Sequence, residues 1–571
     1  MPDSNRMRPA LVDTIRQGYG LGHLRRDAIA GLTVAIVALP LSMAIAIAAG
    51  GTPAMGLYTA IVGGFFISLL GGSRFQIGGP AGAFIVLVAA TVTQHGIGGM
   101  ILATLLAGLL MIAIGTFRLG NYIRFIPYPV TIGFTAGIAV IIFSSQIKDL
   151  LGLTLVAPEP GPLLEKLPVI WHSLPSANPV TIALAAATVL IIAGLKRLAP
   201  RVPSLLAAVA AATLATSLLA LDTPTIASTF GAVPAGLPLP SLPPVSWSLL
   251  IAVLPNAISF ALLGSIEALL SAVVADSMSG QRHDSNMELI AQGVANIASG
   301  VMGGMVATGT IARTATNVRA NAHSPVAGML HALFVLAFMM IAAPLVGLIP
   351  LASLAGLLAT VAWGMIERHA IVTLLRSSRE DAIVLAATLL LTVFRDLTEA
   401  IVVGFALGSV LFIHRMSKAV GVQAVTPDPD DATPQPSGLS RSDEILVYRI
   451  QGAFFFGAAT SVGVVLERIA DTHRALVIDF SQAALVDSTA IQTVGTLVRK
   501  ARGRGVLVVL TGVTPALQTQ FSAHELRPPA VLFEPDIAQG VQRARGLLLG
   551  PSGPDPMAAS AAPEAVTGPA R

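Results

Sequence analysis

The feature that most constrains this chain is a long succession of apolar segments between Ala28 and Ile413. Over the whole sequence 54% of residues are hydrophobic and 11% are charged, against roughly 25% charged residues in ordinary soluble domains. Because water could not solvate so apolar a surface, most of the chain is expected to lie in lipid. The segments interpreted as membrane spans are 28–49, 57–70, 80–95, 99–116, 128–146, 179–195, 203–220, 248–274, 287–302, 309–322, 325–346, 349–366, 382–394 and 398–413.

The positions of the basic residues support this set of fourteen spans. If the N-terminus lies in the cytoplasm and the spans alternate, the outer segments hold only Lys148, Lys166 and Arg395. All other Lys and Arg residues before residue 420 then lie inside, as the positive-inside rule requires. This asymmetry supports an even number of spans with both termini in the cytoplasm. The stretch that precedes Ala28 is polar and contains no evident cleavable signal sequence.

Several classes of protein are excluded or disfavoured. The chain has no cysteine, which excludes disulfides, thiolate metal sites and cysteine nucleophiles. It has no Walker A motif, no nucleotide-binding fold and no plausible catalytic triad, so neither an enzyme nor an ATP-driven pump is expected. No cofactor, metal or nucleic-acid partner is predicted. A metal site at Asp276, Arg282, His283, Asp284 and Asn286 is conceivable, but a solvated cytoplasmic loop is favoured.

The apolar region contains signs of an internal repeat. The offset from Pro40 in the first span to Glu267 in the eighth nearly equals the offset from Pro80, which opens the third span, to Gly309, which opens the tenth. With seven spans in each half, the second half would insert upside down relative to the first. Interrupted segments at matching places of inverted halves predict a substrate site near the middle of the membrane.

Two glycine-containing helix starts are candidates for that site, at 78–83 and 309–314. A helix that begins inside the membrane leaves its first N–H groups unpaired and carries a partial positive charge there. Small residues would let an anion approach these groups, and Arg313 would add a permanent charge. The alternative is that both stretches are glycine-rich loops, with Arg313 as a cytoplasmic anchor. Their repeat-related positions favour the site.

Glu267 is the only acidic residue deep inside a predicted span. Gly264, Glu267 and Ser271 are expected to share one helical face. A buried carboxyl group must be paired or protonated, and one that exchanges its proton would suit a proton-coupled carrier. A structural carboxyl group is the alternative. Pro40 removes one helical hydrogen bond, and an ordinary kink is as plausible there as a break that faces the substrate.

The chemistry changes after the last span. Residues 421–443 are rich in Pro and Asp and are interpreted as a linker. A βα alternation then predicts a small α/β domain over 444–548, and the Ala- and Pro-rich residues 549–571 are expected to be disordered. The expected strands are 445–450, 476–480, 506–510 and 531–533, and the expected helices are 460–469, 488–502, 515–521 and 537–547.

Several motifs together resemble the SulP family of anion transporters, the sulfate-permease or solute carrier twenty-six group. They are GSRFQIGGPAGAF at 72–84, RFIPYPVTIGFTAG at 124–137, SIEALLSAVVAD at 265–276 and ARTATN at 312–317. The C-terminal domain resembles a STAS domain, with VDSTA at 486–490 in the place of its strand-to-helix signature. The resemblance covers about residues 15 to 548 and implies a bacterial member of the family, in the inner membrane.

The resemblance implies a helical membrane domain over 28–420, built of seven plus seven inverted spans, after a cytoplasmic segment at 1–27. A core of spans 1–4 and 8–11 would move against a gate of spans 5–7 and 12–14. The implied substrate-binding residues are Leu41, Ser42, Ile45, Ala81, Gly82, Ser271, Gly309, Thr310, Ile311, Ala312 and Arg313, with Glu267 as the proton-coupling residue. Thr489 would be the phosphorylated hydroxyl of a STAS domain, although in transporters this domain more often anchors a cytoplasmic regulator.

The function expected from this resemblance is proton-coupled symport of sulfate, bicarbonate or a C4-dicarboxylate by an elevator-type movement, in a homodimer. Glu267 stands where sodium-coupled bicarbonate members have Asp, which favours protons over sodium. Ala81 and Ala312 depart from an aromatic residue and a serine in other members, which puts halide selectivity in doubt. The alternatives are an uncoupled anion exchanger or channel on the same scaffold and, less favoured, a membrane-anchored signalling receptor.

Overall fold

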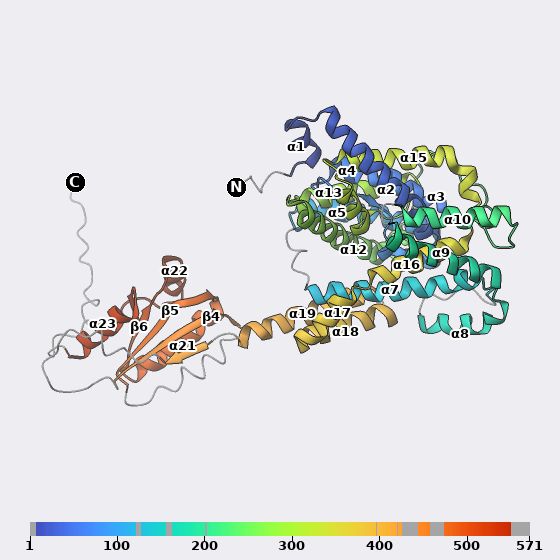
Figure 1. The fold of residues 1–571 in the computed structure, drawn as a ribbon. Coiled ribbons are helices and arrows are strands. Elements are labelled where there is room, and N and C mark those ends of the chain that lie inside the picture. Colours follow the sequence, from blue (N-terminus) through green and yellow to red (C-terminus); the bar gives the residue numbers. More distant parts are fainter. Residues whose placement is uncertain are drawn as a thin grey trace. The chain divides into compact units, whose positions relative to one another are not determined.

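The structure is a computed structural model and describes residues 7–120, 127–155, 163–199, 202–395, 397–418, 421–424, 444–456 and 473–549. The chain divides into two compact units, Met1–Gly408 and Ser409–Arg571. The first unit is helical, and the second contains a five-stranded sheet (Figure 1).

The first half of the helical unit contains elements up to α11. In chain order they are α1 (Ala10–Arg16), α2 (Leu21–Ala48), α3 (Pro53–Tyr58), the π-helical turn η1 (Thr59–Gly63), α4 (Gly64–Leu70), β1 (Gly78–Gly79), the 3₁₀ turn η2 (Gly82–Phe84), α5 (Ile85–Thr116), α7 (Tyr128–Leu151), α8 (Leu163–Ser173), η3 (Leu174–Ser176), α9 (Pro179–Leu198), α10 (Ser204–Leu218) and α11 (Ile226–Phe230).

The second half begins with the long helix α12. Its elements are α12 (Trp247–Ser279), α13 (Ser285–Val301), β2 (Thr308–Gly309), α14 (Ile311–Arg319), α15 (Val326–Gly347), α16 (Leu351–Met365), α17 (Arg368–Ser377), α18 (Arg379–Phe394) and α19 (Leu397–Lys418).

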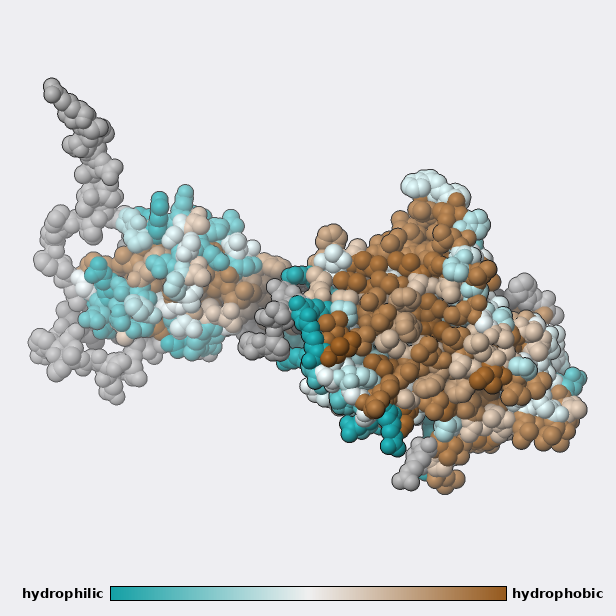
Figure 2. Space-filling model, turned by 90° about the horizontal axis from the view of Figure 1, so that it is seen from above, coloured by the Kyte–Doolittle hydropathy of each residue, from teal (hydrophilic) through white to brown (hydrophobic). Residues whose placement is uncertain are grey.

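Each of the fourteen predicted spans contains a helix, which agrees with the predicted fold class. Within the described residues, nine helical segments are long and apolar enough to cross a membrane. The third and fourth predicted spans are joined in α5, which is interrupted at Gly96, where φ is 70°. Figure 2 shows apolar side chains over much of the visible face of this unit, as expected for a surface in contact with lipid.

Glycines allow very close contact between the two halves. Helix α5 packs on α13, α2 packs on α15, and α12 packs on α5. At the first of these contacts a Cβ atom on Gly108 would lie 2.6 Å from the carbonyl oxygen of Gly293. A Cβ atom on Gly115 would lie 2.7 Å from the carbonyl oxygen of Asn286. Small residues at such contacts are typical of helices that pack in a membrane, because backbone atoms can then touch.

A second set of contacts joins helices that lie between α5 and α12 in the sequence with helices that follow α15. Helix α7 packs on α16 and α18, and α9 packs on α10 and α16. These are the helices that the family resemblance assigned to the gate, and the assignment itself stays a prediction.

The second unit is an α/β sheet domain. Its elements are β3 (Gly421–Ala424), β4 (Ile445–Phe454), β5 (Ala475–Val486), α21 (Ser488–Gly503), β6 (Leu507–Thr511), α22 (Pro515–Ala523), β7 (Leu532–Glu534) and α23 (Ile537–Leu549). The sheet order is β3-β4-β5-β6-β7, with β4 to β7 parallel and β3 antiparallel at the edge.

The four strands and three of the four helices predicted for this domain are present. The predicted linker is wrong at its start, because Gly421–Ala424 forms strand β3 and pairs with β4. The Pro and Asp residues that suggested a linker begin only after this short edge strand. The predicted helix 460–469, most of the linker and the predicted disordered tail lie outside the described residues.

Candidate anion site

The two predicted helix starts meet through a pair of very short strands. Strand β1 precedes η2 and α5, strand β2 precedes α14, and the two strands are antiparallel, with Gly78 opposite Gly309 and Gly79 opposite Thr308. The partners come from the two halves of the apolar region and occupy the repeat-related positions expected from the sequence. The pairing therefore brings together the beginnings of two helices from opposite halves, as in transporters with inverted repeats.

Neither helix start is capped by its own side chain. Ala81 is the N-cap residue of η2, which continues directly into α5, and Thr310 is the N-cap residue of α14. The Thr310 hydroxyl is directed elsewhere, to the carbonyl oxygen of Ile77 at 3.3 Å. The first N–H groups of both helices thus carry their partial positive charge without a side-chain acceptor, which is a favourable arrangement for an anion.

Arg313 lies in the first turn of α14 and is 2% exposed. Its Nη2 donates to Ser42 Oγ at 3.1 Å and to the carbonyl oxygen of Pro80 at 3.3 Å. Its Nη1 packs against Gly79, where any Cβ atom would collide with it. Nε and Nη1 have no hydrogen-bond partner in the part of the chain that the structure describes. A buried guanidinium with unused donors is costly unless a ligand completes its hydrogen bonds.

Helix α2 supplies the wall next to Arg313. Leu41, Ser42 and Ile45 are all buried on this helix, and Ser42 is the residue that accepts from the guanidinium. Helix α2 is continuous from Leu21 to Ala48 and includes Pro40. Of the two alternatives left open for Pro40, a break that faces the substrate is therefore wrong, and the residue is an ordinary helix proline. A proline is tolerated in a membrane helix where neighbouring groups replace the lost hydrogen bond.

The other residues predicted at the helix starts differ in exposure. Ala81 is buried, and Gly82 is partly buried, with Ile142 of α7 and Met365 of α16 as its nearest side chains. Ile311 is 40% exposed and Ala312 is exposed as well. The first turn of α14 is thus exposed at Ile311 and Ala312, whereas Arg313 in the same turn is buried.

Gly309 and Ser271 have structural roles in this geometry. A Cβ atom on Gly309 would collide with the Gln76 side chain, so the pairing of β1 with β2 favours glycine at this position. The Ser271 hydroxyl donates to Thr314 Oγ1 at 3.0 Å, and the same oxygen accepts from the N–H of Ile77 at 3.1 Å. Ser271 is thereby engaged in holding α12, α14 and the β1 segment together.

Glu267 faces a different part of the unit. It lines a small pocket formed by Leu263, Ile266 and Leu270 of α12, by Val130, Thr131, Phe134 and Thr135 of α7, and by Ile401 of α19. No hydrogen bond or ion pair joins its carboxylate to another described residue. Helix geometry places it about 60° around α12 from Gly264 and about 40° from Ser271, so the three residues share one broad face of the helix. Glu267 thus lines the pocket that α12 forms with α7 and α19, whereas the Ser271 hydroxyl is bonded to Thr314 at the helix start.

Sequence reasoning missed several buried polar residues near the strand crossing. Gln76 Nε2 donates to the carbonyl oxygen of Ala268 at 3.2 Å, and Asn317 Nδ2 donates to that of Phe75 at 2.9 Å. His331 of α15 is fully buried, and neither ring nitrogen has a partner among the described residues. The signal for His331 is present in the sequence, since it is a lone ionisable residue in an apolar span.

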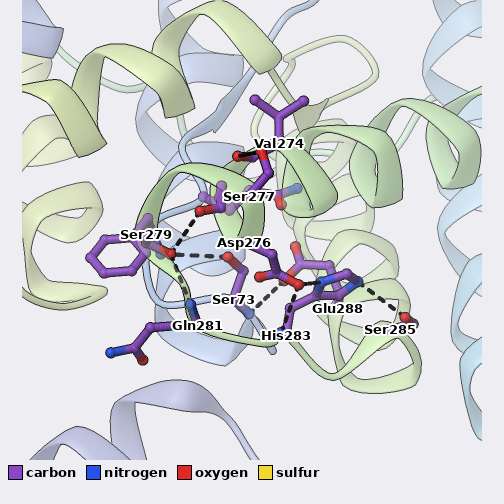
Figure 3. A network of polar contacts seen from close by, with 12 residues as sticks. Ser73, Val274, Asp276, Ser277, Ser279, Gln281, His283, Ser285 and Glu288 are labelled. Carbon is purple, nitrogen blue, oxygen red and sulfur yellow. Dashed lines mark hydrogen bonds and ion pairs between the residues drawn. The ribbon is translucent and has the colours of Figure 1, made fainter.

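The loop after α12 is more organised than the predicted solvated loop. His283 Nδ1 lies 2.7 Å from Asp276 Oδ2, and His283 Nε2 lies 3.0 Å from Ser285 Oγ (Figure 3). Glu288 is completely buried and accepts from the N–H of Ser73 at 3.0 Å. The network therefore ties the start of α13 to the segment that leads into β1.

The order of Asp276, His283 and Ser285 resembles that of a hydrolase triad, but the adjacent amides are occupied. The N–H groups of Asn286 and Met287 both donate to Asp284 Oδ1, so the helix start offers no oxyanion hole. No group of three or more metal-ligating side chains is found in the described ranges. A structural role accounts for all of these contacts.

In the sheet domain, Thr489 lies exposed in the first turn of α21. The preceding Asp487 caps this helix by accepting from the N–H of Ala490 at 2.8 Å. The regulatory role of Thr489 stays a prediction.

Fold and site define a multi-pass helical membrane protein in which two broken helix starts and a buried arginine surround a candidate anion site. Residues 24–388 match the Sulfate permease family, and residues 439–538 match the STAS domain. The chain belongs to the Sulfate permease family, which is made up of transporters, and the resemblance seen in the sequence is confirmed.

Individual relatives agree with this assignment. The putative sulfate transporter YvdB of Bacillus subtilis is 38% identical over 499 residues, which make up 87% of this chain and 93% of that protein. The bicarbonate transporter BicA of Synechocystis is 31% identical over 515 residues, covering 86% and 89%. The solved structure of murine Solute Carrier 26 family member A9, an anion transporter, has a TM-score of 0.82 at 19% identity and covers 95% and 94%, which shows the shared fold.

Proposed function

We propose that this protein is a secondary active transporter of small divalent or monovalent anions of the sulfate, bicarbonate or C4-dicarboxylate class. The single observation that carries the proposal is Arg313, whose buried guanidinium retains two nitrogens without partners between two uncapped helix starts. An anion at this place would accept hydrogen bonds from Nε, Nη1 and helix N–H groups. The names of the relatives, sulfate and bicarbonate transporters, support this class of substrate.

In this proposal the anion lies against Leu41, Ser42 and Ile45 of α2 and between the two helix starts. The first start contributes Ala81 and Gly82, and the second contributes Gly309, Thr310, Ile311, Ala312 and Arg313. Ser271 acts indirectly, by fixing Thr314 and with it the α14 start. The transport movement is that of a core (spans 1–4 and 8–11) sliding against a gate (spans 5–7 and 12–14) in an elevator-type mechanism.

Glu267 is the proposed proton-coupling residue. Its carboxyl group lies in an apolar pocket between α12 on one side and α7 and α19 on the other. A charged carboxylate there would oppose sliding of apolar surfaces, because its desolvation is costly. A protonated carboxyl group would permit the movement. Proton binding at Glu267 would then be a condition for the loaded core to move.

The protein is further proposed to act as a homodimer in the bacterial inner membrane, with both termini in the cytoplasm. The STAS domain would serve as the contact for a cytoplasmic regulator, or as a phosphorylation site at Thr489.

The test is uptake of labelled sulfate, bicarbonate and succinate into proteoliposomes, with and without an imposed pH gradient. We expect one anion class to accumulate with the inward proton gradient, and Glu267→Gln to lose this stimulation while the protein stays folded. The matched control is Glu367→Gln, an exposed acidic residue before α17. Full pH dependence in Glu267→Gln contradicts the coupling role, and counterflow without any gradient dependence supports an exchanger instead.

A further inference from the structure

His331 is a buried ionisable residue for which the proposed function so far has no use. It lies in the second turn of α15 and is 0% exposed. Neither Nδ1 nor Nε2 has a hydrogen-bond partner among the described residues. A buried polar atom without a partner costs about 1–3 kcal/mol, and a neutral imidazole has one donor and one acceptor to satisfy. Such a residue calls for an explanation other than packing, since a leucine or phenylalanine would fill the space without this cost.

The imidazole lies beside strand β1, which pairs with β2. A Cβ atom on Gly64 would lie 3.9 Å from Cε1 of His331 and 2.9 Å from the carbonyl oxygen of Gly78. The next residue along β1, Gly79, packs against Nη1 of Arg313. His331 and Arg313 therefore lie close to the same two-residue strand.

Other unpaired polar atoms occur around this strand. Besides Nε and Nη1 of Arg313, they are Oε1 of Gln76, directly before β1, and Oδ1 of Asn317, one helical turn after Arg313. These unpaired atoms include hydrogen-bond donors on Arg313 and acceptors on Gln76 and Asn317. The imidazole of His331 adds one donor and one acceptor. Buried water typically bridges such sets, since a water molecule makes two to four hydrogen bonds to otherwise unsatisfied groups.

We propose that His331 is a proton-binding residue of the anion site, which takes up a proton when an anion binds at Arg313. The proposal rests on the proposed anion site. It adds a proton site next to the anion, distinct from Glu267, which faces α7 and α19. The chemical class of the ligand is an oxyanion together with one proton.

Electrostatics couple the two binding events. An imidazolium in this buried position is disfavoured first by its desolvation and then by the like charge of Arg313, and an anion between the helix starts would offset both. Anion binding therefore favours proton binding at His331, and by linkage proton binding favours the anion. This coupling gives symport of an anion with a proton a thermodynamic basis at the site itself.

Helix α2 packs against the backbone of His331 at Gly31, one helical turn after Asp27. The ionisable residues of α2 lie in its first two turns, where Asp27 is engaged with Tyr19 and Ser324. Helix α3 contributes Tyr58, while α4, η1 and α11 contain no ionisable residue. Asp27 is thus already paired, whereas Arg313 retains unused donors beside β1 among the described residues.

The experiment is calorimetric titration of the purified full-length protein with sulfate, and with succinate as a second probe. Each titration is run in two buffers of different ionisation enthalpy between pH 5 and pH 8, the range in which histidine titrates. We expect the wild type to take up protons on anion binding, with affinity that weakens up to about tenfold per pH unit as the pH rises, as linkage to one proton requires. His331→Gln should bind with little proton uptake and a flat pH dependence.

The control is His172→Gln, an exposed histidine on α8, which should behave as wild type. Unchanged proton uptake in His331→Gln overturns the proposal and leaves the anion site intact. Failure of the wild type to bind either anion saturably overturns the proposed function and this proposal with it. If His331→Gln does not fold, His331→Asn is titrated in its place, and unchanged proton uptake in that variant overturns the role of His331.

Discussion

Two buried charges in the helical unit, Asp27 in α2 and Arg313 in α14, have opposite surroundings. Asp27 is 0% exposed, and its carboxylate accepts from Tyr19 Oη at 2.8 Å and from Ser324 Oγ and the N–H groups of His323 and Ser324. Arg313 is 2% exposed but uses only Nη2, which has two acceptors. A charge that serves the fold is fully paired, whereas a charge reserved for a ligand retains unused donors.

The largest effect is expected from Asp27→Ala. Removing the carboxylate leaves two buried N–H groups and two hydroxyls at the start of α15 without their acceptor. Breaking a buried polar cluster of this kind costs about 3–5 kcal/mol. We expect a strongly reduced yield of monodisperse protein in detergent, measured by size-exclusion chromatography and a thermal unfolding curve. The control is Asp13→Ala on the exposed side of α1, and equal stability of the two variants would break the comparison.

Arg313→Gln should show the reverse behaviour. Because two guanidinium nitrogens have no partner, their removal is expected to leave the unfolding temperature unchanged or raise it. Uptake should fall by about 100-fold, since loss of a charge-assisted contact to a desolvated anion is worth about 2–5 kcal/mol. Uptake kinetics and unfolding curves are compared with Arg319→Gln, an exposed arginine at the end of the same helix. Normal uptake combined with loss of folding would make Arg313 a structural charge like Asp27.

Ser42→Ala tests how much the one hydroxyl that accepts from Arg313 contributes to anion binding. The guanidinium keeps the Pro80 carbonyl oxygen as an acceptor for Nη2 but loses the hydroxyl at 3.1 Å. Hydrogen bonds to charged groups contribute about 1.5–3 kcal/mol, and partial compensation by Pro80 leads us to expect a three- to tenfold rise in KM. The measurement is initial uptake rate against anion concentration. Thr33→Ala, at an exposed position of α2, should leave KM unchanged.

The smallest effect concerns pH at the Asp27 cluster. The rings of His23 and His323 are stacked, with centroids 3.9 Å apart. Burial, and then the proximity of His23, lower the pKa of His323 below the ordinary value of about 6.5. The unfolded chain therefore binds more protons in this range, so stability should fall as the pH drops below about 6.5 and recover as it rises.

His323→Gln should flatten this dependence, because the imidazole that resists protonation is gone while the backbone N–H to Asp27 remains. The check is the unfolding temperature measured from pH 5 to pH 7.5 for both proteins. An equally steep decline in His323→Gln would assign the pH sensitivity to another group.

Local patterns predicted much of this architecture. The spans follow from apolar runs, and the helix starts at Pro80 and Gly309 follow from glycine and proline, whose effects are confined to neighbouring residues. Arg313 was identifiable because a charge inside an apolar region is rare. The nearly constant offset between the two halves correctly indicated which starts belong together.

What could not be predicted depends on contacts between distant parts of the chain. The two-residue pairing of β1 with β2 has no sequence signal of its own, since strands this short are defined only by their partner. The direction of Glu267 toward α7 and α19 depends on how α12 is rotated against its neighbours. The unpaired state of His331 is likewise a property of packing, because any of the surrounding helices could have supplied an acceptor.

The central claim is that the unused donors of Arg313 are reserved for the transported anion. The most direct measurement is the anomalous difference map of crystals soaked in selenate, which scatters anomalously and resembles sulfate. The account predicts a peak within hydrogen-bond distance of Nε or Nη1 of Arg313, next to the starts of η2 and α14. A map with selenate bound elsewhere in the helical unit, and Arg313 still without partners, would contradict it.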